Sequence, residues 1–208
     1  MEKNDVIGTM QRSVNSLQWF HTIVLSLAVI SSVQQVINYD IVTSTIILKA
    51  EFFHNFIVFL LIVIPFHQGA NRYLDETYIT ENLSVRKFTG LIDFAFFFIE
   101  AVLFYIMSLF ILNNKFFYSW ALLVFVIDVF WLAFVYFANK NLFQKVKPWL
   151  FLNVVAIIII SFFLITNILD NNFKWYLLAF ILLLRTILDY YYSWPFYWPA
   201  FSINKEKE

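Results

Sequence analysis

The chain has 208 residues, of which 62% are hydrophobic and 13% are charged, and its mean hydropathy is +0.74. A soluble domain has about 25% charged residues, and a chain of this size cannot bury so much apolar surface in one soluble core, so the composition excludes a soluble globular protein. The net charge is 0, which gives no field that favours nucleic acid, and the absence of cysteine excludes disulfides, thiolate catalysis and cysteine-ligated metals.

The chain opens with a polar segment, residues 1–16, in which apolar side chains recur every four residues and predict a short amphipathic helix on the membrane surface. Six apolar runs follow, each long enough to cross about 30 Å of hydrocarbon. They are Leu17–Ile37, Ile46–Phe66, Leu91–Leu112, Phe117–Phe137, Pro148–Leu169 and Trp175–Tyr192. The longest connection, residues 68–89, is expected to be a helical extension. Residues 1–208 are therefore predicted to form one all-α, polytopic membrane domain with six transmembrane helices.

The basic residues of the connections predict the orientation. Most of them fall at the two termini, in residues 68–89 and between the fourth and fifth spans, whereas Lys49, Lys115 and Lys174 fall on the opposite side. Because Lys and Arg are enriched in cytoplasmic loops, we expect both termini in the cytoplasm and the protein in the inner (plasma) membrane of a prokaryote. The aromatic segment Tyr190–Trp198 then lies at the inner interface, where Pro195 is expected to end the last helix.

The second span changes from apolar to polar without a loop signal. Pro65, expected to be the only proline inside a span, removes the backbone hydrogen bond to Leu61 and predicts a bend where the helix leaves the hydrocarbon. Beyond it, polar residues share one broad helical face. Two interpretations follow: a solvated cytoplasmic helix, or a gate that surrounds the bend. The residues of the predicted gate are Pro65, His67, Asn71, Arg72 and Asp75.

Ionisable residues at membrane depth are the strongest candidates for a functional site, because each one costs several kcal/mol unless it is paired. Glu100, Asp128 and Arg185 each fall about ten residues into their spans, near the midplane. Asp189 follows Arg185 by one turn, and Asp93 shares a helical face with Glu100. We expect these five residues to form a buried ion cluster that fixes helix packing, the lining of an ion path, or a catalytic acid pair.

Motifs for nucleotide binding, zinc proteolysis and serine hydrolysis are missing from the sequence. His67, Asn71 and Asp75 have metal-compatible helical spacing, but asparagine is a poor ligand and no partner is identified. We therefore expect no catalytic residue, cofactor or metal. Asn153 is expected to make a hydrogen bond between helices.

The favoured hypothesis is a gated, ion-conducting or membrane-disrupting protein that works as a homo-oligomer in the lipid bilayer and responds to a cytoplasmic small molecule or protein. In size, span count and missing catalytic motifs, the chain is similar in general plan to the small multispan effectors of bacterial anti-phage systems. Two alternatives are a lipid-modifying enzyme that uses the carboxylates with His67, and a proton-coupled carrier of small solutes.

Overall fold

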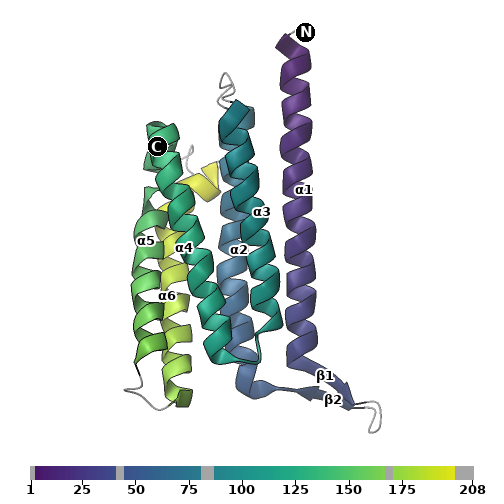
Figure 1. Ribbon diagram of the computed structural model, residues 1–208, viewed down its shortest axis with the longest axis vertical. Helices are drawn as coiled ribbons and strands as arrows, with labels where there is room; N and C mark the ends of the chain where they lie inside the picture. The colour runs from purple at the N-terminus through teal and green to yellow at the C-terminus, as the bar shows by residue number, and fades with distance from the viewer. Residues whose placement is uncertain (1–2, 41–44, 81–86, 167–170, 200–208) are drawn as a thin grey trace, which may run out of the picture.

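The computed structural model describes residues 3–40, 45–80, 87–166 and 171–199 (Figure 1). The helices are α1 (Lys3–Val36), α2 (Phe53–Asp75), α3 (Lys87–Leu109), α4 (Asn114–Ala138), α5 (Lys140–Ile165) and α6 (Asn171–Tyr197). A short hairpin of β1 (Ile37–Asp40) and β2 (Thr45–Leu48) joins α1 to α2. A 3-10 turn, η1 (Ala50–Phe52), precedes α2, and a π-helical turn, η2 (Glu76–Thr80), follows it.

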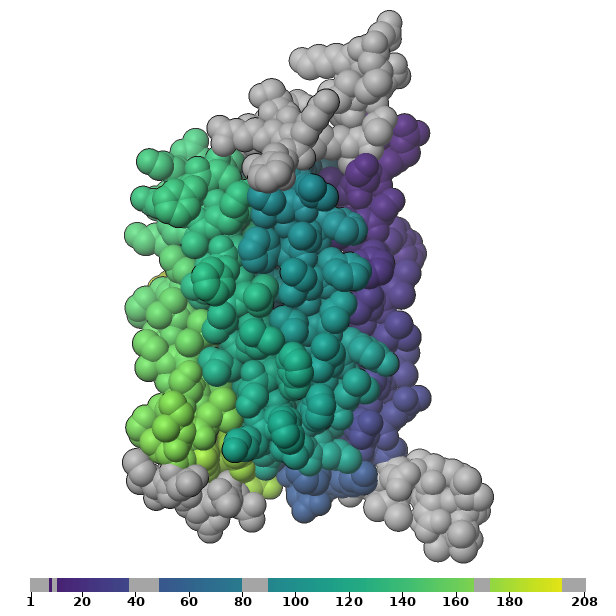
Figure 2. All heavy atoms as spheres, viewed as in Figure 1, coloured from purple at the N-terminus to yellow at the C-terminus, as the bar shows by residue number. Residues whose placement is uncertain are grey.

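The six helices run alternately in opposite directions, and Figure 1 shows the start of α1 and the end of α6 at the same end of the bundle. We call this the terminal end and the opposite one the hairpin end. Helix α1 packs on both α2 and α3. Helix α3 packs on α4, α4 on α5, and α5 on α6, and α6 returns to pack on α2. The helices therefore form a ring whose inward-facing side chains fill its centre, and Figure 2 shows the closely packed outer face of α3 and α4.

Asparagine caps explain two of the tight turns. The side chain of Asn113 accepts a hydrogen bond from the Phe116 amide at 3.2 Å, and that of Asn139 accepts one from the Leu142 amide at 3.1 Å. Each cap satisfies an amide that has no partner within its helix, so α4 and α5 begin almost immediately after the preceding helices end.

Five segments are long and apolar enough to cross a membrane. They are Gln11–Val36, Ala50–Ile79, Gly90–Leu109, Asn114–Ala138 and Lys140–Ile165. Helix α6 has 27 residues but also carries Arg185, Asp189 and, near its start, Lys174. The prediction of a helical chain whose helices are long and apolar enough to cross a membrane is thus confirmed.

The boundaries of the first two spans differ from the predictions. Helix α1 is continuous from Lys3, so the expected surface helix of residues 1–16 is the first part of α1 rather than a separate element. The second span was expected to begin at Ile46, but Thr45–Leu48 pairs with β1 and α2 begins only at Phe53. The hydropathy of an apolar run does not distinguish a strand from a helix. When the run is rich in β-branched residues, their preference for strands decides between the two.

Two predictions about proline were wrong. Pro65 is not the only proline within a membrane-crossing helix, because Pro148 lies inside α5, and α6 continues through Pro195 to Tyr197. The fifth helix begins at Lys140 rather than at Pro148, where its span was expected to start. Proline removes only one backbone donor, and in a packed membrane helix neighbouring groups can satisfy the carbonyl that it releases.

Two apolar clusters fill the ring. The hairpin-side core includes Phe59, Phe104, Phe117 and Phe125. The terminal-side core, near the terminal end, includes Tyr73, Trp131, Trp149, Phe196 and Tyr197.

Candidate functional site

A polar cluster lies between the two cores and draws on four helices. Its members, which we call the central cluster, are Glu100 of α3, Asp128 of α4, Asn153 of α5, and Arg185 and Asp189 of α6. Each of these side chains is at most 6% exposed. Four of the five ionisable residues that the sequence singled out are therefore brought together.

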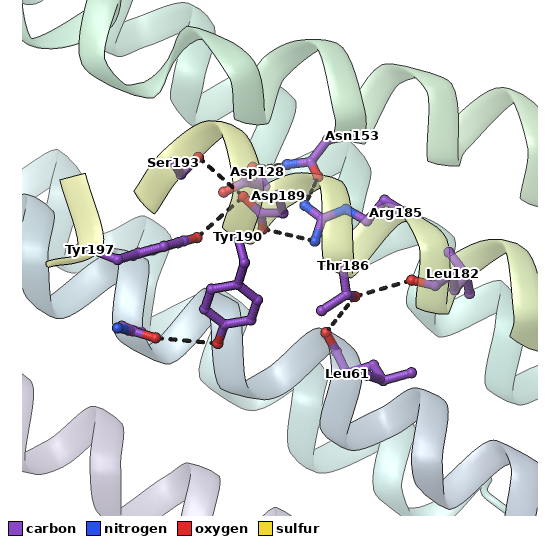
Figure 3. A network of polar contacts seen from close by, with 11 residues as sticks. Leu61, Asp128, Asn153, Leu182, Arg185, Thr186, Asp189, Tyr190, Ser193 and Tyr197 are labelled. Atoms are coloured by element: carbon purple, nitrogen blue, oxygen red, sulfur yellow. Dashed lines mark hydrogen bonds and ion pairs between the residues drawn. The ribbon is translucent and has the colours of Figure 1, made fainter. Parts of the chain in front are cut away.

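Arg185 organises one half of the central cluster (Figure 3). Its Nη1 donates to Oδ2 of Asp189 at 3.0 Å, and its Nη2 donates to Oδ1 of Asn153 at 2.5 Å. The amide nitrogen of Asn153 in turn donates to Oδ2 of Asp128. Asn153 thus bridges Arg185 and Asp128, and the interhelical hydrogen bonding expected of it is confirmed. The guanidinium also lies over the ring of Phe125, 5.3 Å from its centroid.

Glu100 and Asp128 form the other half of the central cluster. Their carboxyl groups lie close enough to interact directly. Two carboxylates have no proton to donate, so a hydrogen bond between these groups would require a proton on one of them. The cluster contains three carboxyl groups and one guanidinium, so acid groups outnumber cations. Oε1 of Glu100 has no protein partner within the described residues.

Asp189 connects the cluster to the terminal end. Its Oδ1 accepts hydrogen bonds from the hydroxyls of Ser193 and Tyr197, both at 3.3 Å (Figure 3). Ser193 and Tyr197 lie one and two turns further along α6. Hydrogen-bonding groups therefore extend from the midplane towards the terminal end, whereas the hairpin-side core beyond the cluster is lined by apolar side chains.

A small cavity of about 20 Å³ lies beside the central cluster. Residues from five helices line it: Pro65, Phe66, Gly69 and Ala70; Phe97 and Glu100; Asp128 and Trp131; Trp149 and Asn153; and Arg185, Asp189 and Tyr197. A water molecule needs about 10–15 Å³ of such space, so the cavity has the size of one water. It brings carboxyl, guanidinium and amide groups to one solvent-sized site.

Asp93, the fifth predicted member, lies in a separate site. Its carboxylate accepts hydrogen bonds from the hydroxyl of Tyr78 at 2.6 Å, the hydroxyl of Tyr73 at 3.2 Å and the indole nitrogen of Trp131 at 2.9 Å. Three neutral donors thus surround one buried acid. Asp93 and Glu100 share a helical face, but their carboxyl groups lie in separate sites. Aromatic donors from α2, η2 and α4 surround Asp93 instead.

The predicted gate residues His67, Asn71 and Asp75 are packed against α1. Nδ1 of His67 lies 3.2 Å from Nδ1 of His21, and Nε2 of His67 lies 3.2 Å from the amide nitrogen of Asn71. Asp75 accepts a hydrogen bond from Gln18 at 2.9 Å. This face of α2 therefore joins two helices. Within the described residues, no group of three His, Asp or Glu side chains converges as metal ligands.

The other two gate residues contact α6. Arg72 donates from Nε to the carbonyl oxygen of Phe196 at 3.1 Å. Pro65 releases the carbonyl of Leu61, and the hydroxyl of Thr186 donates to that oxygen at 3.0 Å (Figure 3). The turn of α2 that contains Pro65 is thus tied to the turn of α6 that carries Arg185. Sequence reasoning missed this contact, because Thr186 is an ordinary polar residue in its span.

Gly69 permits close packing between α2 and α5. A Cβ at this position would lie 2.8 Å from Cη2 of Trp149. Trp149 itself packs on the rings of Phe196 and Tyr197, with centroid distances of 5.3 Å and 5.8 Å. Glycine is needed here because the indole ring lies directly against the α2 backbone, one turn from Pro65.

No family model matches the chain, and no curated protein or solved structure matches it either. Function must therefore be argued from the geometry of the site.

Proposed function

We propose that this chain is a multi-pass membrane protein that conducts ions across the bilayer, and that the ion handled at its centre is the proton. The observation that carries the proposal is the adjacent pair of carboxyl groups, Glu100 and Asp128, which both line a cavity of about 20 Å³. Such a cavity accommodates a water but not a hydrated metal ion. A proton, in contrast, can pass through carboxyl groups and a single water without a wide opening.

The arrangement of the two cores supports a gate on the hairpin side. From the central cluster, Asp189, Ser193 and Tyr197 offer hydrogen-bonding groups towards the terminal end. On the other side, Phe104 and Phe125 of the hairpin-side core block a continuous polar path. Conduction then requires water to enter between these aromatic rings. A bend at Pro65, whose adjacent residue Phe66 packs on both rings, is suited to control that step.

Orientation and assembly belong to the same proposal. We place α6 across the membrane as the sixth span, because it lies along α2 and α5 within the ring. The basic residues then place the terminal end in the cytoplasm of a prokaryotic cell. A path for larger ions would have to lie between copies of the chain in a homo-oligomer, opened by a cytoplasmic small molecule or protein.

A labelling experiment tests the orientation. Because the chain has no cysteine, single cysteines at Gln144 and Asn113, both exposed, provide clean reporters of the two ends. We expect a membrane-impermeant thiol reagent to label Asn113→Cys in intact cells and Gln144→Cys only after the cells are opened. The reverse pattern would contradict the orientation.

Proton flux into liposomes tests conduction. The full chain is reconstituted with a pH-sensitive dye inside, and a potassium gradient with valinomycin drives uptake. We expect Glu100→Gln and Asp128→Asn to lower the flux at least tenfold, since an amide cannot pass on a proton. Asp93→Asn is the matched control, because it removes a buried carboxylate of α3 outside the central cluster. Equal flux in all four proteins would overturn the proposal.

The alternative supported by a specific observation is a proton-coupled carrier, because a carrier needs the same protonatable pair. It would move protons only when its solute is present, whereas a conductor needs no solute. The lipid-modifying enzyme is disfavoured by the size of the cavity, since a lipid substrate has no room to reach Glu100 or Asp128.

A further inference from the structure

We propose that a groove at the terminal end binds the phosphate of an anionic phospholipid. The groove has a volume of about 390 Å³ and lies between α2, α5 and α6. This size falls in the range of about 300–1,000 Å³ that is usual for small-molecule sites. The site is separate from the central cluster, and the proposal does not depend on ion conduction.

Two cations and one carboxylate line the groove. Nη2 of Arg72 lies 3.5 Å from Oε2 of Glu76, and Nζ of Lys145 contacts Oε1 of the same carboxylate. One acid thus holds two cations from different helices close together, and the described lining of the groove carries one more cation than acid. Arg72 and Lys145 remain 26% and 45% exposed, so both can reach a ligand in the groove. A phosphate group has the charge and the acceptors to bind between them.

Arg72 is held in position by the groove wall. Its Nε donates to the carbonyl oxygen of Phe196 at 3.1 Å, and its guanidinium lies 5.9 Å from the centroid of the Phe196 ring. These contacts fix the plane of the guanidinium before a ligand arrives. A preorganised cation loses less conformational entropy on binding, which favours recognition by this side chain.

The remaining wall of the groove is apolar and aromatic. It is formed by Pro148 of α5 and by Tyr192, Pro195, Phe196 and Pro199 at the end of the chain that the structure describes. A charged subsite next to an apolar wall matches an amphiphile better than a free anion. The phosphate would contact the cations, and the glycerol and upper acyl chain would lie along the prolines and Tyr192.

The position of the groove fits the interface of the membrane. Lys145 lies near the start of the α5 span, and Arg72 lies near the end of the α2 span. Basic pockets between helices at the cytoplasmic surface are suited to anionic headgroups.

Lipid binding to the full chain in neutral detergent tests the proposal. Binding of phosphatidylglycerol, phosphatidylcholine and soluble glycerol phosphate is compared by native mass spectrometry and by the shift in melting temperature. We expect phosphatidylglycerol to bind and stabilise, with little effect of the other two. Arg72→Gln and Lys145→Gln should each weaken phosphatidylglycerol binding about tenfold, or about 1.4 kcal/mol.

Two further variants make the test specific. Glu76→Gln removes the competing carboxylate and should strengthen phosphatidylglycerol binding, an effect of opposite sign. Lys147→Gln, an exposed lysine of the same helix outside the groove, is the matched control and should bind as the parent does. Equal binding of phosphatidylcholine, or equal loss in Lys147→Gln and Lys145→Gln, would overturn the site. Equal binding of glycerol phosphate would overturn its assignment to a lipid.

Discussion

The two buried acids of α3 lie seven residues apart on one helical face but in opposite environments. Asp93 accepts hydrogen bonds from three neutral donors, Tyr73, Tyr78 and Trp131. Glu100 contacts another carboxyl, that of Asp128, and one of its oxygens has no protein partner within the described residues. The same helix therefore carries one carboxylate whose acceptors are used and one whose hydrogen bonding is incomplete.

The two acids therefore differ in what a change of protonation would do to their contacts. A buried carboxylate whose acceptors are used stabilises one arrangement of the helices, because a proton added to it would compete with the donors that it already binds. A buried group with an unused acceptor beside a water-sized cavity is poised to exchange a proton. Oε1 of Glu100 and Nε of Arg185 have no protein hydrogen-bond partner within the described residues, and both side chains line the water-sized cavity.

The largest effect is expected when the cation of the central cluster is removed. Arg185→Ala leaves Asp189 without its ion pair and Asn153 without its donor, and should lower the free energy of unfolding by about 3–5 kcal/mol. The measurement is the folded yield from membranes and the melting temperature in detergent. Lys115→Ala, a change at an exposed lysine, serves as the control.

A second variant shows whether the loss comes from the stranded acid. Arg185→Met with Asp189→Asn removes both charges of the ion pair and should recover much of the folded yield. If Arg185→Ala melts at the parent temperature, the guanidinium contributes nothing to the fold and the central cluster is not a stabilising network.

An intermediate effect is expected at Asp93. Asp93→Leu deprives the buried donors of Tyr73 and Trp131 of their acceptor, and should cost about 2–3 kcal/mol, near the lower limit of about 1–3 kcal/mol for each unsatisfied group. Glu100→Gln should change stability by less than about 1 kcal/mol, since its amide still donates to Asp128 and a surplus acid is removed. Melting temperatures of the two variants compare the acids directly. Equal losses would erase the distinction between the two sites.

The sequence predicted that Glu100, Asp128 and Arg185 lie at one level of the bundle, but not which groups contact each other there. Rise per residue placed Glu100, Asp128 and Arg185 near the midplane, because depth depends only on counting from the ends of each apolar run. Which groups meet depends also on how each helix is rotated about its axis and on its neighbours. Those facts are non-local, so the bridge through Asn153 and the separate surroundings of Asp93 were not predicted.

The same limit applies to the fold. Apolar runs predicted the helices well where they are bounded by asparagine caps, as at Asn113. They failed at Thr45–Leu48, where hydropathy does not distinguish a strand from a helix. The polar face of α2 could be read as solvated or as a gate. Its contacts with α1 and α6 depend on partners far away in the sequence, Gln18 and Phe196.

The smallest expected effect concerns the contact between α2 and α6 beside Pro65. The hydroxyl of Thr186 is shared between the carbonyls of Leu61 and Leu182, both at 3.0 Å. Thr186→Val nearly keeps the shape of the side chain but leaves the Leu61 carbonyl without this donor, and should cost about 1 kcal/mol. Thr22→Val is the matched control, because the hydroxyl of Thr22 is exposed and donates only within its own helix, to Gln18 at 2.8 Å.

Combining this change with Pro65→Ala tests whether the bend and α6 are coupled. An alanine at position 65 supplies the backbone N–H that proline lacks, so the Leu61 carbonyl gains a partner within α2. Thr186→Val should then cost less than it does beside Pro65, with a coupling energy of at least about 0.5 kcal/mol. If the bend also gates conduction, Pro65→Ala should change proton flux at equal protein levels, whereas Thr22→Val should not. Strictly additive losses of stability, with unchanged flux, would show that Thr186 does not hold the bend and that Pro65 has no part in gating.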